Sequence, residues 1–126
     1  MPATVDTTTY PGVLWLRLVG AQKVDDMTGF LAAHNAAVDA YAGEDYRVLC
    51  DIRELAPLSP EAAAVFEEAK RYSAAHTNFR GSAVLVSKKI VAMQHERTSA
   101  ASGVSSTELL TDDETAAWEH LRTVSR

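Results

Sequence analysis

The sequence is short of cysteine, of glycine-rich segments and of long apolar runs, and each shortage excludes a class of protein. Cys50 is the only cysteine among 126 residues, so an internal disulfide is excluded and a reducing, cytoplasmic setting is predicted. The glycines form no phosphate-binding loop of the P-loop or Rossmann type. No apolar run approaches the length of a membrane span, and the polar, Thr-rich N-terminus has no signal-peptide pattern.

Basic residues are also too few and too scattered for a nucleic-acid-binding face. The chain carries 12 Lys and Arg against 17 Asp and Glu, which gives a net charge of −5. A nucleic-acid-binding domain normally concentrates its basic residues on one face. Binding to DNA, RNA or anionic lipid is therefore not expected.

Cysteine and histidine form no metal-binding pattern. Cys50 lies in the middle of an apolar segment, where a free cysteine is usually a small buried hydrophobic residue. The four histidines are His34, His76, His95 and His120, and no two have i,i+4 spacing on one expected helix. We interpret them as core or half-exposed residues, and we predict no metal and no cofactor.

Apolar periodicity predicts a single α/β domain over residues 12–126, preceded by a tail or edge strand at 1–11. The hydrophobic fraction is 47%, which is enough for a core. Strands are expected at 13–19, 47–52, 82–87 and 105–110, and helices at 24–41, 59–76, 90–101 and 111–121. This alternation predicts a four-stranded, mainly parallel sheet with alternating helices (βαβαβαβα), with room for an extra N-terminal edge strand.

Two of the expected helices have clear start signals. Ser59 is placed to cap the second helix, and Pro60 suits its first position. Thr111 and Glu114 have the spacing of a capping box at the start of the last helix. The buried stripe of the second helix is expected to comprise Ala62, Val65, Ala69, Tyr72 and His76, with Glu67 and Arg71 as an exposed ion pair.

Asp51 is the acidic residue best placed for chemistry, because it lies at the carboxyl end of the expected strand 47–52. Functional groups gather at the carboxyl ends of strands in open α/β sheets, and residues 87–89 follow the next strand. An acid and a lysine so placed are typical of phosphoacceptor receiver domains. Those domains also need an acidic pair after the first strand to hold magnesium, but this chain has Val19, Gly20 and Ala21 there, and none of these is acidic. The competing interpretation is that Asp51 accepts hydrogen bonds from the following turn and pairs with Arg53 or a lysine.

Several segments resemble one known family. The segments that carry the resemblance are 48–55 and 58–62, together with 12–16, 83–86 and 111–118. The chain resembles the SpoIIAA-like branch of the STAS superfamily over nearly its whole length, roughly residues 12–121. The resemblance implies the βα fold shared by anti-sigma-factor antagonists and CRAL-TRIO lipid-transfer domains. In the antagonists a partner kinase phosphorylates a serine at the start of the second helix, usually after an Asp. Here the Asp position holds Ser59 and the serine position holds Pro60.

Three functions follow from these observations. The first is a non-enzymatic regulatory or protein-interaction module without the usual switch serine, with a protein partner or a homodimer. The second is a carrier of a lipid or another small apolar ligand, of CRAL-TRIO-like type. The third is an enzyme that uses Asp51, Lys88 and His95. The candidate interaction or ligand surface comprises Asp51, Arg53, Leu58, Ser59, Glu61, Ser87, Lys88 and Lys89.

Overall fold

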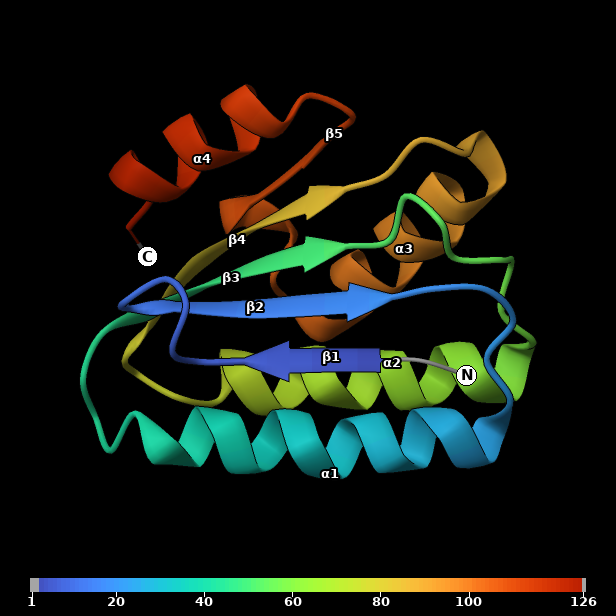
Figure 1. Cartoon of the computed structure of the whole chain (residues 1–126), viewed down its shortest axis with the longest axis horizontal. Helices are drawn as coiled ribbons and strands as arrows, with labels where there is room; N and C mark the ends of the chain where they lie inside the picture. Colours follow the sequence, from blue (N-terminus) through green and yellow to red (C-terminus); the bar gives the residue numbers. More distant parts are fainter. Residues whose placement is uncertain (1–2, 126) are drawn as a thin grey trace.

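One five-stranded sheet runs through the molecule, and its strands lie in the order in which they occur in the chain (Figure 1). The computed structural model describes residues 3–125. The strands are β1 (Ala3–Asp6), β2 (Val13–Leu18), β3 (Tyr46–Asp51), β4 (Phe79–Leu85) and β5 (Glu108–Thr111). β2 to β5 are parallel, and β1 pairs antiparallel with β2 at one edge. The predicted α/β sheet is confirmed, with the additional strand inside the segment 1–11; residues 1 and 2 of that segment lie outside the described residues.

The helices cover the two faces of the sheet unequally. They are α1 (Val24–Ala40), α2 (Pro60–Ala74), α3 (Lys89–Ser102) and α4 (Glu114–Thr123), with a short 3₁₀ turn η1 (Ser105–Thr107). The main core lies between the sheet and α1, α2 and α3, whereas a smaller apolar cluster lies under α4. Figure 1 shows α1 and α2 together on one side, with α4 on the other. Within residues 3–125 we find no helix with the length and apolar character needed to cross a membrane.

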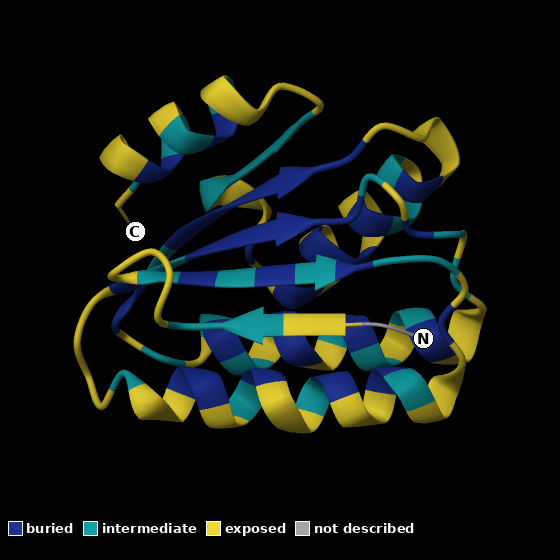
Figure 2. Ribbon diagram, in the orientation of Figure 1, coloured by how far each residue is buried: buried dark blue, intermediate teal, exposed yellow. Residues whose placement is uncertain are grey.

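The central strands bury both faces. In β2, Leu14 and Leu16 are buried in the main core, while Trp15 is half-buried beside the α4 cluster. In β3, Cys50 faces the main core and Leu49 faces α4. Figure 2 shows β3 and β4 buried along most of their length and β1 more exposed. The continuous apolar segment around Cys50 therefore has the environment typical of a parallel central strand.

The buried stripe of α2 differs from the predicted one. The structure buries Phe66, Lys70 and Ser73 in addition to Ala62 and Ala69. The predicted members Val65, Tyr72 and His76 are only half-buried. The reason is that α2 lies between α1 and α3 as well as on the sheet, so its buried sector is wider than the stripe of a helix that contacts only one surface.

The last βα unit begins later than predicted. Residues 105–107 form η1 rather than a strand, and α4 has Asp113 rather than Thr111 as its N-cap. The Asp113 side chain accepts a hydrogen bond from the Thr115 N–H at 3.0 Å. Thr111 is the last residue of β5, and its hydroxyl accepts a hydrogen bond from the Asp113 N–H at 3.0 Å rather than from the Glu114 N–H that the predicted capping box requires.

Candidate functional site

The four parallel strands end at one edge of the sheet, and Asp51 lies there as the last residue of β3. Its carboxylate accepts hydrogen bonds from the Arg53 backbone N–H at 3.1 Å and from the Arg53 guanidinium at 3.1 and 2.8 Å. Asp51 is 7% exposed. The interpretation of Asp51 as a locally satisfied acid is confirmed.

Further ion pairs extend from Asp51 toward solvent. Arg17 lies 4.0 Å from its carboxylate and also pairs with Glu54, while Arg53 reaches Glu114 at 3.5 Å. Burial opposes ionisation of Asp51, but the hydrogen bonds from Arg53 and the charges of Arg53 and Arg17 outweigh it, so the pKa of Asp51 lies below its usual value. Asp51 is therefore a carboxylate held by arginines, a structural role rather than that of a free base.

Side chains at this edge connect its loops by hydrogen bonds. The Ser87 hydroxyl donates to the Arg53 carbonyl at 3.0 Å, and the Lys88 ammonium lies 3.5 Å from the Leu55 carbonyl. The Gln94 amide, on α3, bonds both the N–H and the carbonyl of Leu58 at 3.0 and 2.9 Å. These contacts join the segment before α2 to α3.

The start of α2 matches its sequence signal. The Ser59 hydroxyl accepts a hydrogen bond from the Ala62 N–H at 3.1 Å, and Pro60 is the first helical residue. Glu61 follows in the first turn and is exposed. The predicted N-cap is confirmed, and the hydroxyl of Ser59 is engaged in it.

Two large apolar side chains on α3 are exposed beside this edge, and sequence reasoning missed them. Ile90 is 57% exposed and Met93 is 53% exposed. They lie three residues apart on one helix face, directly after Lys88 and Lys89. We call the exposed and half-buried part of this edge the carboxyl-edge surface, which comprises Arg53, Leu58, Ser59, Glu61, Ser87, Lys88, Lys89, Ile90 and Met93.

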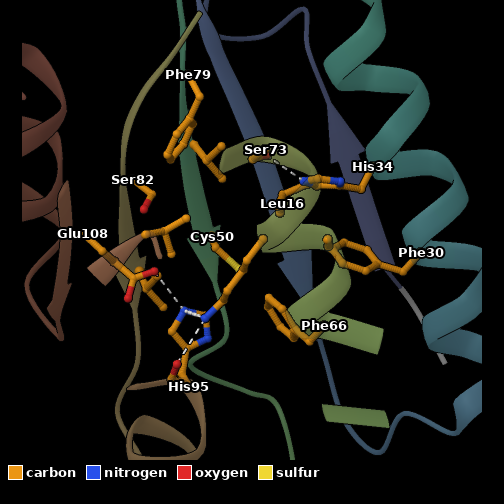
Figure 3. Close-up of a pocket in the computed structure, with 15 residues that line it drawn as sticks. Leu16, Phe30, His34, Cys50, Phe66, Ser73, Phe79, Ser82, His95 and Glu108 are labelled. Carbon is orange, nitrogen blue, oxygen red and sulfur yellow. Dashed lines mark hydrogen bonds and ion pairs between the residues drawn. The ribbon is translucent and has the colours of Figure 1, made fainter. Parts of the chain in front are cut away.

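A second group, buried beneath α3, was also missed. The Lys70 ammonium, from α2, lies 2.8 Å from His95 Nε2, 2.7 Å from Thr98 Oγ1 and 2.6 Å from Ser99 Oγ. The Glu108 carboxylate, from β5, accepts a hydrogen bond from Ser99 Oγ at 2.6 Å and lies 3.3 Å from His95 Nε2. Figure 3 shows the side chains of Glu108 and His95 facing each other.

The charges of the buried group depend on one another. Burial lowers the pKa of Lys70 to about 8. Burial and the charge of Lys70 also lower the pKa of His95. Burial opposes ionisation of Glu108, but His95, Lys70 and Ser99 outweigh it, so its pKa is lowered. The group therefore holds a cationic Lys70, a neutral His95 and an anionic Glu108 at neutral pH.

A small cavity of about 40 Å³ adjoins this group. Its lining includes Cys50, Phe66 and Ser82 (Figure 3). Burial raises the pKa of the Cys50 thiol to about 12, which agrees with its interpretation as a small hydrophobic residue. The Ser82 hydroxyl has no hydrogen-bond partner among the described residues.

The structure does not assemble the catalytic set of the enzyme hypothesis. Asp51 bonds Arg53, Lys88 contacts a backbone carbonyl, and His95 lies in the buried group with Lys70. Within residues 3–125, no three His, Cys, Asp or Glu side chains lie together as a metal site.

The buried group had a weak signal in the sequence. Lys70 follows Phe66 by four residues on α2, and Ser99 follows His95 by four residues on α3. A helical stripe centred on Phe66, rather than on Val65, places Lys70 in the core. Nothing local indicates Glu108, which reaches the group only through the pairing of β4 with β5.

A parallel sheet with an antiparallel edge strand, with α1 to α3 on one face and α4 on the other, is the SpoIIAA-like fold, as the sequence resemblance implies. No protein-family model and no curated protein sequence matches the chain. The solved structures that match the chain include three that are each similar over nearly their whole length.

The first is an uncharacterised protein from the DUF3478 family with a SpoIIAA-like fold, from Shewanella loihica. It is 19% identical with a TM-score of 0.66, over 95% of this chain and 92% of that one. An anti-sigma factor antagonist from Mycobacterium paratuberculosis is 15% identical with a TM-score of 0.64, over 96% and 95%. The anti-sigma factor antagonist SpoIIAA, in its unphosphorylated form, is 12% identical with a TM-score of 0.68, over 97% and 99%.

Proposed function

We propose that the protein is a non-enzymatic regulatory module that binds a protein partner through the carboxyl-edge surface. The observation that carries this proposal is the exposure of Ile90 and Met93, at 57% and 53%, beside Lys88 and Lys89. Large apolar side chains that stay exposed together in a folded domain mark an interaction site more often than scattered single ones do.

The chemistry of the surface defines the partner. Lys88 and Lys89 place two positive charges next to Ile90 and Met93, on a chain whose net charge is −5. An apolar pocket flanked by carboxylates on the partner would complement both features. The two apolar side chains would supply most of the binding free energy, and the lysines would supply orientation and speed of association.

The similar structures add a fold-level analogy. Two of them are anti-sigma factor antagonists. By this analogy the partner is a protein of the kind that such antagonists bind. We do not extend regulation by phosphorylation at the start of the second helix to this chain, because the position of the family's switch serine holds Pro60, which has no hydroxyl.

The test begins with affinity capture from an extract of the cells that make the protein, followed by calorimetric titration of the purified pair. The double variant Ile90→Ser, Met93→Ser should weaken binding by tenfold or more, since each truncated apolar contact at an interface centre removes roughly 1–2 kcal/mol. The control is Tyr10→Ser, which removes a 40% exposed aromatic residue that precedes β2 and so lies toward the opposite edge of the sheet.

Equal affinity of the double variant and the wild type would refute the assignment of partner binding to the carboxyl-edge surface. If no captured protein binds the purified chain, and sedimentation shows no self-association, the proposal that the chain is a protein-interaction module is refuted. A lipid or other apolar ligand retained in native mass spectrometry would instead support the carrier hypothesis. The cavity of about 40 Å³ beside Lys70 and His95 has room for a few waters and is much smaller than the roughly 150 Å³ cavity that holds benzene, so we expect no apolar ligand in this smaller cavity.

A further inference from the structure

α3 is attached to the molecule in a different way from its neighbours. Its buried residues are Val91, His95, Thr98, Ser99 and Ser102, of which only Val91 is apolar. By contrast, α1 buries Met27, Phe30, Ala37 and Val38 in addition to His34. The inner face of α3 is therefore held by polar contacts, which depend on the charge of the groups that make them.

Lys70 and Glu108 make most of those contacts, and α3 lies between them. Ser99 Oγ accepts a hydrogen bond from Lys70 and donates one to Glu108, each at 2.6 Å. His95 Nε2 lies 2.8 Å from Lys70 Nζ and 3.3 Å from Glu108 Oε2. The charge pair thus connects α2 to β5 through two side chains of α3.

The proton on His95 decides whether this arrangement holds. While Lys70 is cationic, His95 Nε2 can only accept its hydrogen bond, so the imidazole must be neutral. A proton on Nε2 would place two cations 2.8 Å apart in a buried site with one carboxylate. The other titratable groups facing the site do not relieve this. Cys50 on β3 remains a neutral thiol, and Glu67 on α2 is partly exposed and paired with Arg71.

We propose that Lys70, His95 and Glu108 form a latch that holds α3 in place while His95 is neutral and releases α3 when His95 is protonated. Because α3 carries Ile90 and Met93, release also disrupts the carboxyl-edge surface. This second consequence rests on the proposed function, whereas the latch itself does not.

The size of the effect follows from proton linkage. If the closed latch holds His95 neutral and the open state lets it titrate near its ordinary value of 6.5, acid favours the open state. The equilibrium constant for opening of α3 then rises by up to tenfold per pH unit below about 6.5. Above that value the opening does not depend on His95.

Amide hydrogen exchange on the whole protein, followed by NMR and corrected for the intrinsic pH dependence of exchange, measures this opening. Between pH 6.5 and 5.5 the amides of α3 should lose about fivefold in protection. His95→Gln, whose amide oxygen can accept from Lys70 without titrating, should abolish the loss. The matched control is His34→Gln on α1, because His34 is equally buried and its pKa is also lowered by burial.

Loss of α3 protection that persists in His95→Gln, or that disappears in His34→Gln, would overturn the latch. If His95→Gln does not fold, the imidazole of His95 is titrated by NMR in the wild type. Its protonation should coincide with opening of α3, and protonation without opening would overturn the latch. Selective opening of α3 in a protein that binds no partner would support the latch and contradict the proposed function.

Discussion

Replacement of Lys70 by Met removes the cation of the buried group and leaves the Glu108 carboxylate, whose side chain is 3% exposed, without its partner. Met fills nearly the same volume, so the change is mainly electrostatic. Uncompensated buried charges destabilise a protein strongly, typically by 3–5 kcal/mol. We therefore expect Lys70→Met to lower the free energy of unfolding at pH 7.

The magnitude can be worked from the two charges. Burial lowers the pKa of Lys70 from 10.5 to about 8, which corresponds to about 3 kcal/mol against keeping the amine charged in the folded protein. Lys70→Met relieves that cost but leaves Glu108 without its cation, while Glu108 keeps the hydrogen bond from Ser99. We expect a net loss of about 3 kcal/mol, at the low end of the range for a broken buried pair.

Urea unfolding followed by tryptophan fluorescence measures these losses in a double-mutant cycle. Glu108→Gln should lower the free energy of unfolding by a similar amount, because it leaves the buried Lys70 cation without its carboxylate partner. The double variant Lys70→Met, Glu108→Gln should lose no more than about 1 kcal/mol, because no charge remains to be compensated. Lys89→Met, the same substitution at an exposed position, should change stability by less than about 0.5 kcal/mol. Additive losses, or a neutral Lys70→Met, would refute the charge coupling.

Three further predictions concern single positions. Ser59→Ala should lower the free energy of unfolding by about 1 kcal/mol through loss of the N-cap of α2, and an unchanged urea midpoint would contradict that role. Cys50, with a pKa of about 12, should react with a thiol reagent at pH 8 only as the protein unfolds in urea; rapid labelling in buffer would show an accessible thiol. Gly81→Ala should destabilise by roughly 1–3 kcal/mol, because its Cβ would lie 2.6 Å from Val124 at a φ of 146°, whereas Gly29→Ala, with open space around it, should not destabilise.

The sequence predicts those features of the fold that depend on local periodicity. The alternation in residues 13–18 places Leu14 and Leu16 in the core, and the continuous apolar segment around Cys50 identifies the central strand. The second-helix cap and the ion pairing of Asp51 with Arg53 were also predictable, because each involves residues close in the chain. Local chemistry is sufficient for such contacts.

The sequence does not predict the features that depend on distant segments. Lys70 and Glu108 are 38 positions apart, and a lysine on a helix is usually exposed. The buried face of α3 consists mostly of polar residues, so no apolar periodicity in the sequence shows which face of the helix leaves Ile90 and Met93 exposed. Long-range charge pairing leaves no periodic signal, so the sequence does not indicate the buried group as a whole.

The central claim is that a protein partner binds at the carboxyl ends of the strands. Its most direct test is an NMR footprint of the isotope-labelled chain with its purified partner, in which protection of backbone amides is compared between free and bound states. The account predicts that the changes gather at the starts of α2 and α3, around Ser59, Lys89 and Met93. A footprint centred on α4 and Trp118, with the start of α3 unaffected, would contradict it.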